Sequence, residues 1–194
     1  MKKSITIIGE GETEWFYFES LRITCRYPFK LSPDFPQHAD IEHILKLAKA
    51  KLTEDYDYVV CLIDMDRLIE KSAEMQKYQS FKSRKENRNI IFIETNPCTE
   101  FWFLLHFLPD NTVRRYQNYD QLIPELRKYM PGYEKTKRYF IKTKLYDYLR
   151  ANGSIERAKS NAEKLSQMSK SSPEDSIAYS EIYKVIKLLD DLNQ

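Results

Sequence analysis

The acidic residue with the most unusual surroundings is Glu10. It lies between Gly9 and Gly11, directly after a short apolar run, in a chain that has only four glycines. Two of those four at one turn indicate that the backbone there requires glycine. They also leave the glutamate sterically accessible. The alternative is an ordinary strand-to-helix turn, in which Glu12 and Glu14 only favour the dipole of the following helix.

A second acidic pair, Asp64 and Asp66, follows the most strand-like run of the chain, residues 58–63. In an extended segment alternate side chains share a face, so we expect both carboxylates to point the same way. Two acids held together repel each other unless a cation or a proton intervenes. Their oxygens suit magnesium, which typically binds through one or two carboxylates and keeps several waters. The alternative is a polar loop in which one aspartate caps the next helix.

The two acidic sites together are stronger evidence for a metal site than either one alone. Both follow apolar runs that are expected to be strands of one parallel sheet, and ligands bind beyond the carboxyl ends of such strands. Glu10, Asp64 and Asp66 are therefore expected to converge on one or two Mg²⁺ or Mn²⁺ ions, which can stabilise the attacking and leaving oxygens of a phosphoryl displacement. The chain has three histidines and no clustered cysteines, so zinc or non-haem iron chemistry is a poor fit.

A basic, aromatic stretch runs from residue 127 to residue 150. It contains eight lysines and arginines against two acids, whereas the whole chain has a net charge of +2. Cations neutralise phosphates and aromatic faces stack on unpaired bases, so this stretch is a candidate nucleic-acid-binding surface. The alternative is a solvated helical surface whose tyrosines pack on the core. The candidate phosphate-binding residues are Arg127, Lys128, Lys135, Lys137, Arg138, Lys142 and Lys144, and the aromatic residues between them include Tyr133, Phe140 and Tyr146.

Alternating strands and helices must position these residues. Buried strands are predicted at residues 4–8, 58–63 and 89–93, with a weaker one within 23–31. Helices are predicted at residues 13–21, from an Asp40 cap to 52, at 68–78, and from Pro97 to 107. This order predicts an α/β fold with a mainly parallel sheet of about four strands flanked by helices.

The pattern changes after Pro109. No buried strand is expected there, and amphipathic helices follow, one from Ser154 and a last one opened by Ser172 as a cap and Pro173 in the first turn. We therefore predict a catalytic domain over residues 1–109 and a helical C-terminal region, residues 110–194, packed on it.

The composition limits the class of protein. A chain of 194 residues with 42% hydrophobic and 31% charged residues is typical of one globular domain and not of a disordered one. Its three cysteines are widely spaced without a CxxC pair, which favours buried thiols in a reducing cytosol. The apolar run before Gly9 is too short for a signal peptide or a membrane span. A cytoplasmic protein without a membrane partner is expected.

The order of strand, EGxTE, strand and DxD resembles the Toprim domain of primases, topoisomerases, OLD-type nucleases and small ribonucleases. More narrowly, EGETEWFYFESL (10–21), LIDMD (62–66) and TNPCTEFWFLLHF (95–107) resemble the RloB-like proteins, a prokaryotic family found in restriction and abortive-infection loci. The helical end, with SIERAKSNAEKL and SPEDSIAYSEIYKVIKLL, is also similar to that family, so the resemblance covers most of the chain.

The resemblance implies roles for single residues. Glu10 matches the Toprim glutamate, a metal ligand or general acid/base, and Asp64 and Asp66 match its metal-binding aspartates. Glu14 matches the second glutamate of the OLD-type motif and would complete the metal shell, while Glu100 is a further catalytic candidate. His106, nearly two turns beyond Glu100, is expected to be a packed or capping histidine.

The implied function is Mg²⁺- or Mn²⁺-dependent cleavage of DNA or RNA in anti-phage defence, with an ATPase encoded alongside as an expected partner. One alternative is a catalytically inactive Toprim module that only binds nucleic acid or a partner. Another is a phosphatase of the haloacid-dehalogenase type, in which Asp64 would be the nucleophile, although that scheme leaves the turn at Glu10 unexplained. The sequence indicates no oligomeric state.

Overall fold

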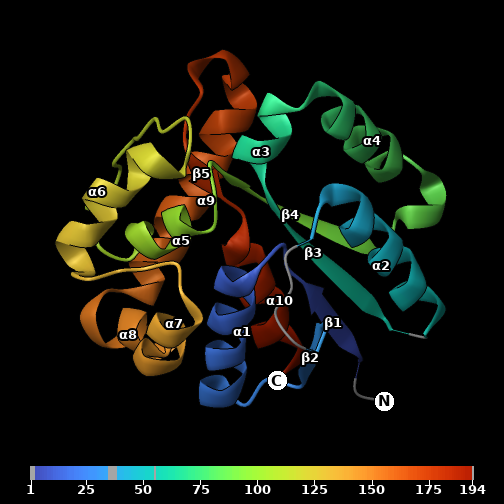
Figure 1. Ribbon diagram of the computed structural model, residues 1–194, viewed down its shortest axis with the longest axis horizontal. Coiled ribbons are helices and arrows are strands. Elements are labelled where there is room, and N and C mark those ends of the chain that lie inside the picture. Colours follow the sequence, from blue (N-terminus) through green and yellow to red (C-terminus); the bar gives the residue numbers. More distant parts are fainter. Residues whose placement is uncertain (1–2, 35–38, 55, 194) are drawn as a thin grey trace.

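The computed structural model describes residues 3–34, 39–54 and 56–193. In this part of the chain a five-stranded sheet lies at the centre, with the strand order β2-β1-β3-β4-β5 (Figure 1). The first four strands are parallel and the last pairs antiparallel with its neighbour. The strands are β1 (Ile5–Ile8), β2 (Phe29–Ser32), β3 (Tyr58–Asp64), β4 (Ile90–Asn96) and β5 (Tyr179–Ser180). The predicted α/β class with a mainly parallel sheet is confirmed.

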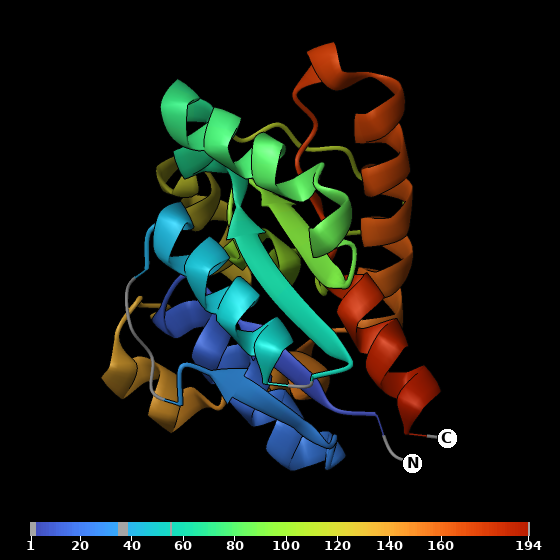
Figure 2. The same ribbon diagram turned by 90° about the vertical axis from the view of Figure 1, so that its right-hand side faces the viewer.

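Helices cover both faces of the sheet. They are α1 (Glu12–Cys25), α2 (Ile41–Thr53), α3 (Met65–Glu70), α4 (Ser72–Lys82), α5 (Glu100–Leu105), α6 (Tyr119–Tyr129), α7 (Lys137–Thr143), α8 (Leu145–Asn152), α9 (Ile155–Ser171) and α10 (Ile182–Leu192). Figure 2 shows α2 and α4 side by side on one side of the sheet. Throughout the described ranges, no helix combines the length and the apolar character that crossing a bilayer requires.

The strands are buried because their alternate side chains supply two separate cores. Ile7 and Leu62 belong to the larger core, whereas Ile8 and Cys61 belong to the smaller one under α2 and α4. Continuous apolar strands of this kind are typical of parallel sheets covered on both faces. This burial on two sides holds the carboxyl ends of β1 and β3 at a defined place.

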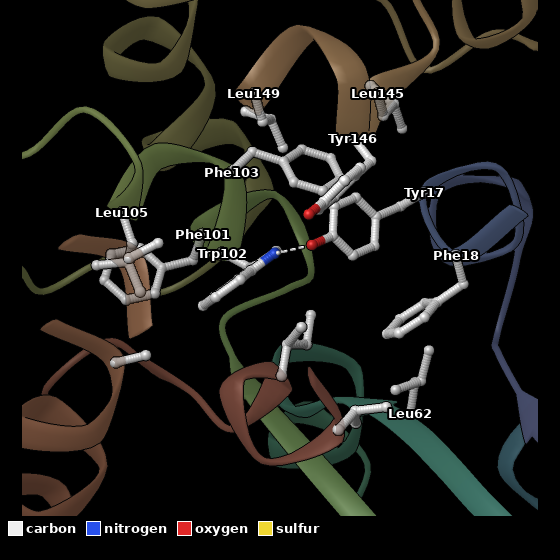
Figure 3. Close-up of a cluster of buried hydrophobic side chains, with 14 of the residues drawn as sticks. Tyr17, Phe18, Leu62, Phe101, Trp102, Phe103, Leu105, Leu145, Tyr146 and Leu149 are labelled. Atoms are coloured by element: carbon white, nitrogen blue, oxygen red, sulfur yellow. Dashed lines mark hydrogen bonds between the residues drawn. The ribbon is translucent and has the colours of Figure 1, made fainter. Parts of the chain in front are cut away.

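An aromatic cluster joins the two halves of the chain in the larger core (Figure 3). The indole Nε1 of Trp102 in α5 donates a hydrogen bond of 2.7 Å to the hydroxyl of Tyr17 in α1, and both side chains are fully buried. Tyr146 of α8 packs edge-on against Tyr17, with the ring centroids 6.1 Å apart. The C-terminal helices therefore share one core with the sheet.

Two expectations about the C-terminal segment are wrong. A strand does occur after Pro109, since Tyr179 and Ser180 pair with the end of β4. Two residues are too few to show an alternating pattern, and the free edge of β4 provides the pairing. Ser172 and Pro173 do not open the last helix but a short 3₁₀ turn, Pro173–Asp175, and α10 begins only at Ile182.

The helix predicted at residues 68–78 is two helices instead of one. The backbone at Lys71 (φ −121°, ψ 84°) leaves the helical region, so α3 ends at Glu70 and α4 begins at Ser72. The helix predicted from Pro97 begins three residues later, at Glu100. A helical propensity that runs through both segments gave no signal for the break.

Candidate active site at the carboxyl ends of β1 and β3

The strand order creates a crevice beside β1. From β1 the chain crosses to β2 on one side, and from there to β3 on the other side of β1. Where neighbouring strands lead in opposite directions, the loops at their carboxyl ends separate and leave room for a ligand. A cavity of about 580 Å³ lies at this place, and its lining includes the five acidic residues Glu10, Glu12, Glu14, Asp64 and Asp66.

Asp64, the last residue of β3, is held by well-defined partners. Its Oδ1 accepts hydrogen bonds from the backbone N–H of Thr99 at 2.9 Å and from the Thr99 hydroxyl at 3.0 Å. The backbone N–H of Asp64 in turn donates to Oε1 of Glu10 at 3.0 Å. The ends of β1 and β3 and the start of α5 are thus connected through these two carboxylates.

Asp66 lines the cavity, but not for the reason expected from the sequence. The strand ends at Asp64, and Asp66 lies in the first turn of α3, so the argument from alternating side chains is wrong. The backbone N–H of Asp66 donates to the carbonyl of Pro97 at 3.0 Å, and its carboxylate accepts from the N–H of Arg67 at 2.7 Å. The helical turn keeps this carboxylate at the cavity, where it is half-buried.

The position of Glu14 explains why one of the two residues that flank Glu10 is a glycine. Its Oε2 accepts from the backbone N–H of Gly11 at 2.9 Å, so it caps the first turn of α1 while lining the cavity. A Cβ atom on Gly9 would lie 2.7 Å from the Cβ of Glu14, closer than side-chain atoms pack. Gly11 has an extended backbone that any residue adopts. The requirement for glycine that the sequence predicted at this turn therefore comes from the close approach of Glu14 to Gly9.

Burial and mutual repulsion make these carboxylates weak acids. Burial and the nearby Glu14 raise the pKa of Glu10 from 4.5 to about 8, although the N–H of Asp64 and the charge of Arg67 partly oppose the shift. Burial, followed by repulsion from Glu14 and Glu10, also raises the pKa of Asp64 well above its ordinary value. Burial raises the pKa of Asp66 as well. Such a cluster favours whatever adds positive charge, either protons or a cation.

Glu100 lies behind the residues that line the cavity and is not one of them. It is fully buried, and its Oε1 accepts from the Thr13 hydroxyl at 3.2 Å and from the Tyr133 hydroxyl at 2.9 Å. The ammonium group of Lys135 lies 3.3 Å from the same oxygen. No hydrogen-bond partner for its Oε2 is found in the described part of the chain. The geometry gives Glu100 a positioning role toward Lys135.

His106 is a packed histidine, as expected. Its ring is fully buried, Nδ1 lies 2.9 Å from the carbonyl of Trp102, and burial lowers its pKa to about 4. It stays neutral at physiological pH and does not line the cavity.

One residue of the predicted basic surface reaches the cavity, namely Lys135. Arg127 donates through Nε to the carbonyl of Tyr133 at 3.1 Å and so supports the loop that carries Lys135. Lys128, Lys137, Arg138, Lys142 and Lys144 are exposed outside the cavity. The expectation that the aromatics stack on bases is wrong for Tyr133, Phe140 and Tyr146, because these three side chains are buried in the core.

Three further lining residues were missed in the sequence: Arg67, Cys98 and Tyr119. Arg67 directly follows the acidic pair, and its Nη1 lies 3.9 Å from Oε2 of Glu10, so its position was a usable signal. Cys98 stands inside the stretch that resembles the RloB-like proteins. Tyr119 gave no signal, because it reaches the cavity through tertiary packing, in which α6 contacts α5.

The donor set suits a hard cation by chemistry, since carboxylate oxygens are the ligands of Mg²⁺ and Mn²⁺. In the described residues, however, no group of three Asp, Glu, His or Cys side chains is arranged so that it could hold a metal ion as it stands. Carboxylates that lie near one another repel, so a bound cation would have to draw them together. Glu10, Asp64, Asp66 and Glu14 are of the right type and line the same cavity, but their side chains would have to move before they could hold an ion together.

The family model described as RloB-like protein matches residues 5–189, nearly the whole chain. No curated protein and no solved structure matches the chain.

Proposed function

The chain belongs to the RloB-like family, and from this premise we propose that it is a Mg²⁺- or Mn²⁺-dependent nuclease that cleaves phosphodiester bonds of nucleic acid in anti-phage defence. The observation that carries the proposal is the single cavity onto which β1, α1, β3 and α3 bring the carboxylates of Glu10, Glu14, Asp64 and Asp66. The defence setting, the relation to Toprim nucleases and a co-encoded ATPase partner rest on the family resemblance.

In this proposal each residue of the site has a task. Glu10, Asp64, Asp66 and Glu14 would hold the ion, which would supply positive charge for the attacking and leaving oxygens of the displacement. Thr99 fixes the orientation of Asp64 through two hydrogen bonds. Lys135, anchored on Glu100, presents an ammonium group to an incoming phosphate. Glu10, with a pKa of about 8, can exchange a proton near neutral pH before an ion is bound.

A cleavage assay tests the proposal. Labelled single- and double-stranded DNA and RNA are incubated with the protein in Mg²⁺, Mn²⁺ or EDTA. Asp64→Asn and Glu10→Gln keep the size of the side chain and remove its charge, so cleavage should fall on the order of 100-fold in both. Asp110→Asn, an exposed residue that does not line the cavity, should cleave like the wild type.

The alternative functions predict different results in the same assay. Cleavage that survives both substitutions, or that persists in EDTA, would sink the metal-site assignment. Metal-dependent binding of nucleic acid without turnover would favour the inactive binding module. Release of phosphate from a small monoester, lost in Asp64→Asn, would favour the phosphatase.

A further inference from the structure

Tyr119 is an aromatic residue at an acidic cavity. It is the first residue of α6, its ring is partly exposed, and it lines the cavity together with Asp64 and Asp66. Asn118 caps α6 by accepting from the N–H of Gln121 at 3.2 Å, which fixes the start of the helix. The ring is thus presented by a defined turn next to the carboxylates.

Lys135 stands beside this ring. Its Nζ lies 5.2 Å from the centroid of Tyr119, within the range of a cation–π contact. The same Nζ lies 3.3 Å from Glu100, so the ammonium group is held between a buried carboxylate and an aromatic face. The loop that carries it is anchored by Tyr133, whose side chain is buried and whose hydroxyl donates to Glu100. Even so, the side chain of Lys135 remains 42% exposed and is available to a ligand.

The cavity has the volume of a small-molecule site. At about 580 Å³ it falls inside the range of roughly 300–1,000 Å³ that encloses one drug-sized ligand. One aromatic face and one ammonium group beside a cluster of carboxylates match the three parts of a nucleotide step: a base, a phosphate and its counter-ion. A base within a stacked duplex has no free face to offer Tyr119, whereas an unpaired base does.

We propose that Tyr119 and Lys135 hold an unpaired nucleotide at the cavity, with the base stacked on the face of Tyr119 that Lys135 does not occupy and its phosphate on Lys135, so that single-stranded nucleic acid is the substrate class. This inference rests on the proposed nuclease function, because it places the scissile phosphate beside Asp64 and Glu10. Tyr119 is then a specificity-determining residue. Glu100 is a positioning residue, since it acts on the substrate only through Lys135.

Binding can be measured separately from cleavage. In the Asp64→Asn background and in Mg²⁺, fluorescence anisotropy is recorded for a short labelled single strand, for its duplex and for the strand with abasic sites. The single strand should bind more tightly than the other two. Tyr119→Ala should weaken single-strand binding about tenfold and leave duplex binding nearly unchanged. Tyr119→Trp, which keeps an aromatic face, should bind like the parent.

Matched variants separate stacking from damage to the fold. Tyr119→Leu fills space without an aromatic face and should lose the same affinity as Tyr119→Ala, while circular dichroism shows the same helix content. Tyr183→Ala, on α10 and outside the cavity, should change nothing in binding. Lys135→Ala should reduce the slope of log affinity against log salt by about 0.7, the value of one single-strand phosphate contact. Lys187→Ala, an exposed lysine of α10 that does not line the cavity, should leave that slope unchanged.

The results distinguish the two proposals. Equal binding of duplex and single strand, or unchanged affinity in both Tyr119→Ala and Tyr119→Leu, overturns the assignment of an unpaired nucleotide even if the protein proves to be a nuclease. Single-strand binding that depends on Tyr119, without cleavage in the wild type, supports this inference and overturns the proposed function instead.

Discussion

The buried carboxylates of the cavity are expected to lower the stability of the fold when they are ionised. Glu10 and Asp64 are each less than one-tenth exposed and lie close to Glu14, with Arg67 and Lys135 as the cationic residues of the cavity lining. Ionised carboxylates in such surroundings are disfavoured unless a partner compensates them. In the proposed function, the bound cation offsets this cost.

This cost predicts a pH dependence of stability in the metal-free protein. Folded Glu10 keeps its proton up to about pH 8, whereas an unfolded glutamate loses it near 4.5, so the folded state binds more protons between these values. The contribution of Glu10 to the free energy of unfolding is then fully present below the pKa of the unfolded state. It is lost as the pH rises through the pKa of the folded state. In EDTA, Tm should drop on the order of 5 °C between about pH 6 and about pH 8.5.

Differential scanning fluorimetry of the wild type, Glu10→Gln and Asp110→Asn measures this effect. Glu10→Gln should flatten the decline, and Asp110→Asn should keep it. Adding Mg²⁺ should raise Tm most at the high pH, where the carboxylates are ionised. A wild-type Tm that increases over this pH window would contradict the raised pKa.

At the scale of elements, the turn between β1 and α1 is shaped by one close contact. Gly9 leaves space for Glu14, which in turn caps α1 and lines the cavity. Gly153 makes a similar contact in a different place, because a Cβ there would lie 2.7 Å from the Cβ of His106. The two glycines therefore offer a comparison of the same steric change at and away from the site.

We expect Gly9→Ala to displace Glu14 and to lower both activity and stability. Cleavage should fall at least about tenfold, and overpacking of about 1–3 kcal/mol should lower Tm by several degrees. Gly153→Ala should lower Tm by a similar amount but leave cleavage at the wild-type level, once both are assayed below their transitions. If Gly9→Ala cleaves normally, Glu14 does not need its observed position for activity.

At the scale of the whole molecule, one core connects the sheet with the C-terminal helices. Trp102, Tyr17 and Tyr146 come from α5, α1 and α8 and meet in the same cluster (Figure 3). Because this cluster crosses the predicted boundary at residue 109, we expect residues 1–109 and 110–194 to unfold together.

Tyr17→Phe tests this cooperativity. It leaves the buried indole N–H of Trp102 without its acceptor, which should cost about 1–3 kcal/mol and lower Tm by several degrees. Wild type and variant should each show one transition, with the same midpoint by tryptophan fluorescence and by far-UV circular dichroism. Two separate midpoints would show that the two regions unfold independently.

The sequence by itself determined the α/β class, the parallel strands β1, β3 and β4, and the meeting of Glu10 with Asp64, because strand periodicity and the carboxyl-end rule are local signals. Only the tertiary structure decided that Asp66 lies on a helix, that Glu100 stands behind the wall, and that Lys135 alone of the predicted basic residues reaches the cavity. It also decided the presence of β5 and the place of Tyr119. These features depend on packing between segments far apart in the chain, and no local pattern of residue types encodes which side chains such packing buries and which it leaves at the cavity.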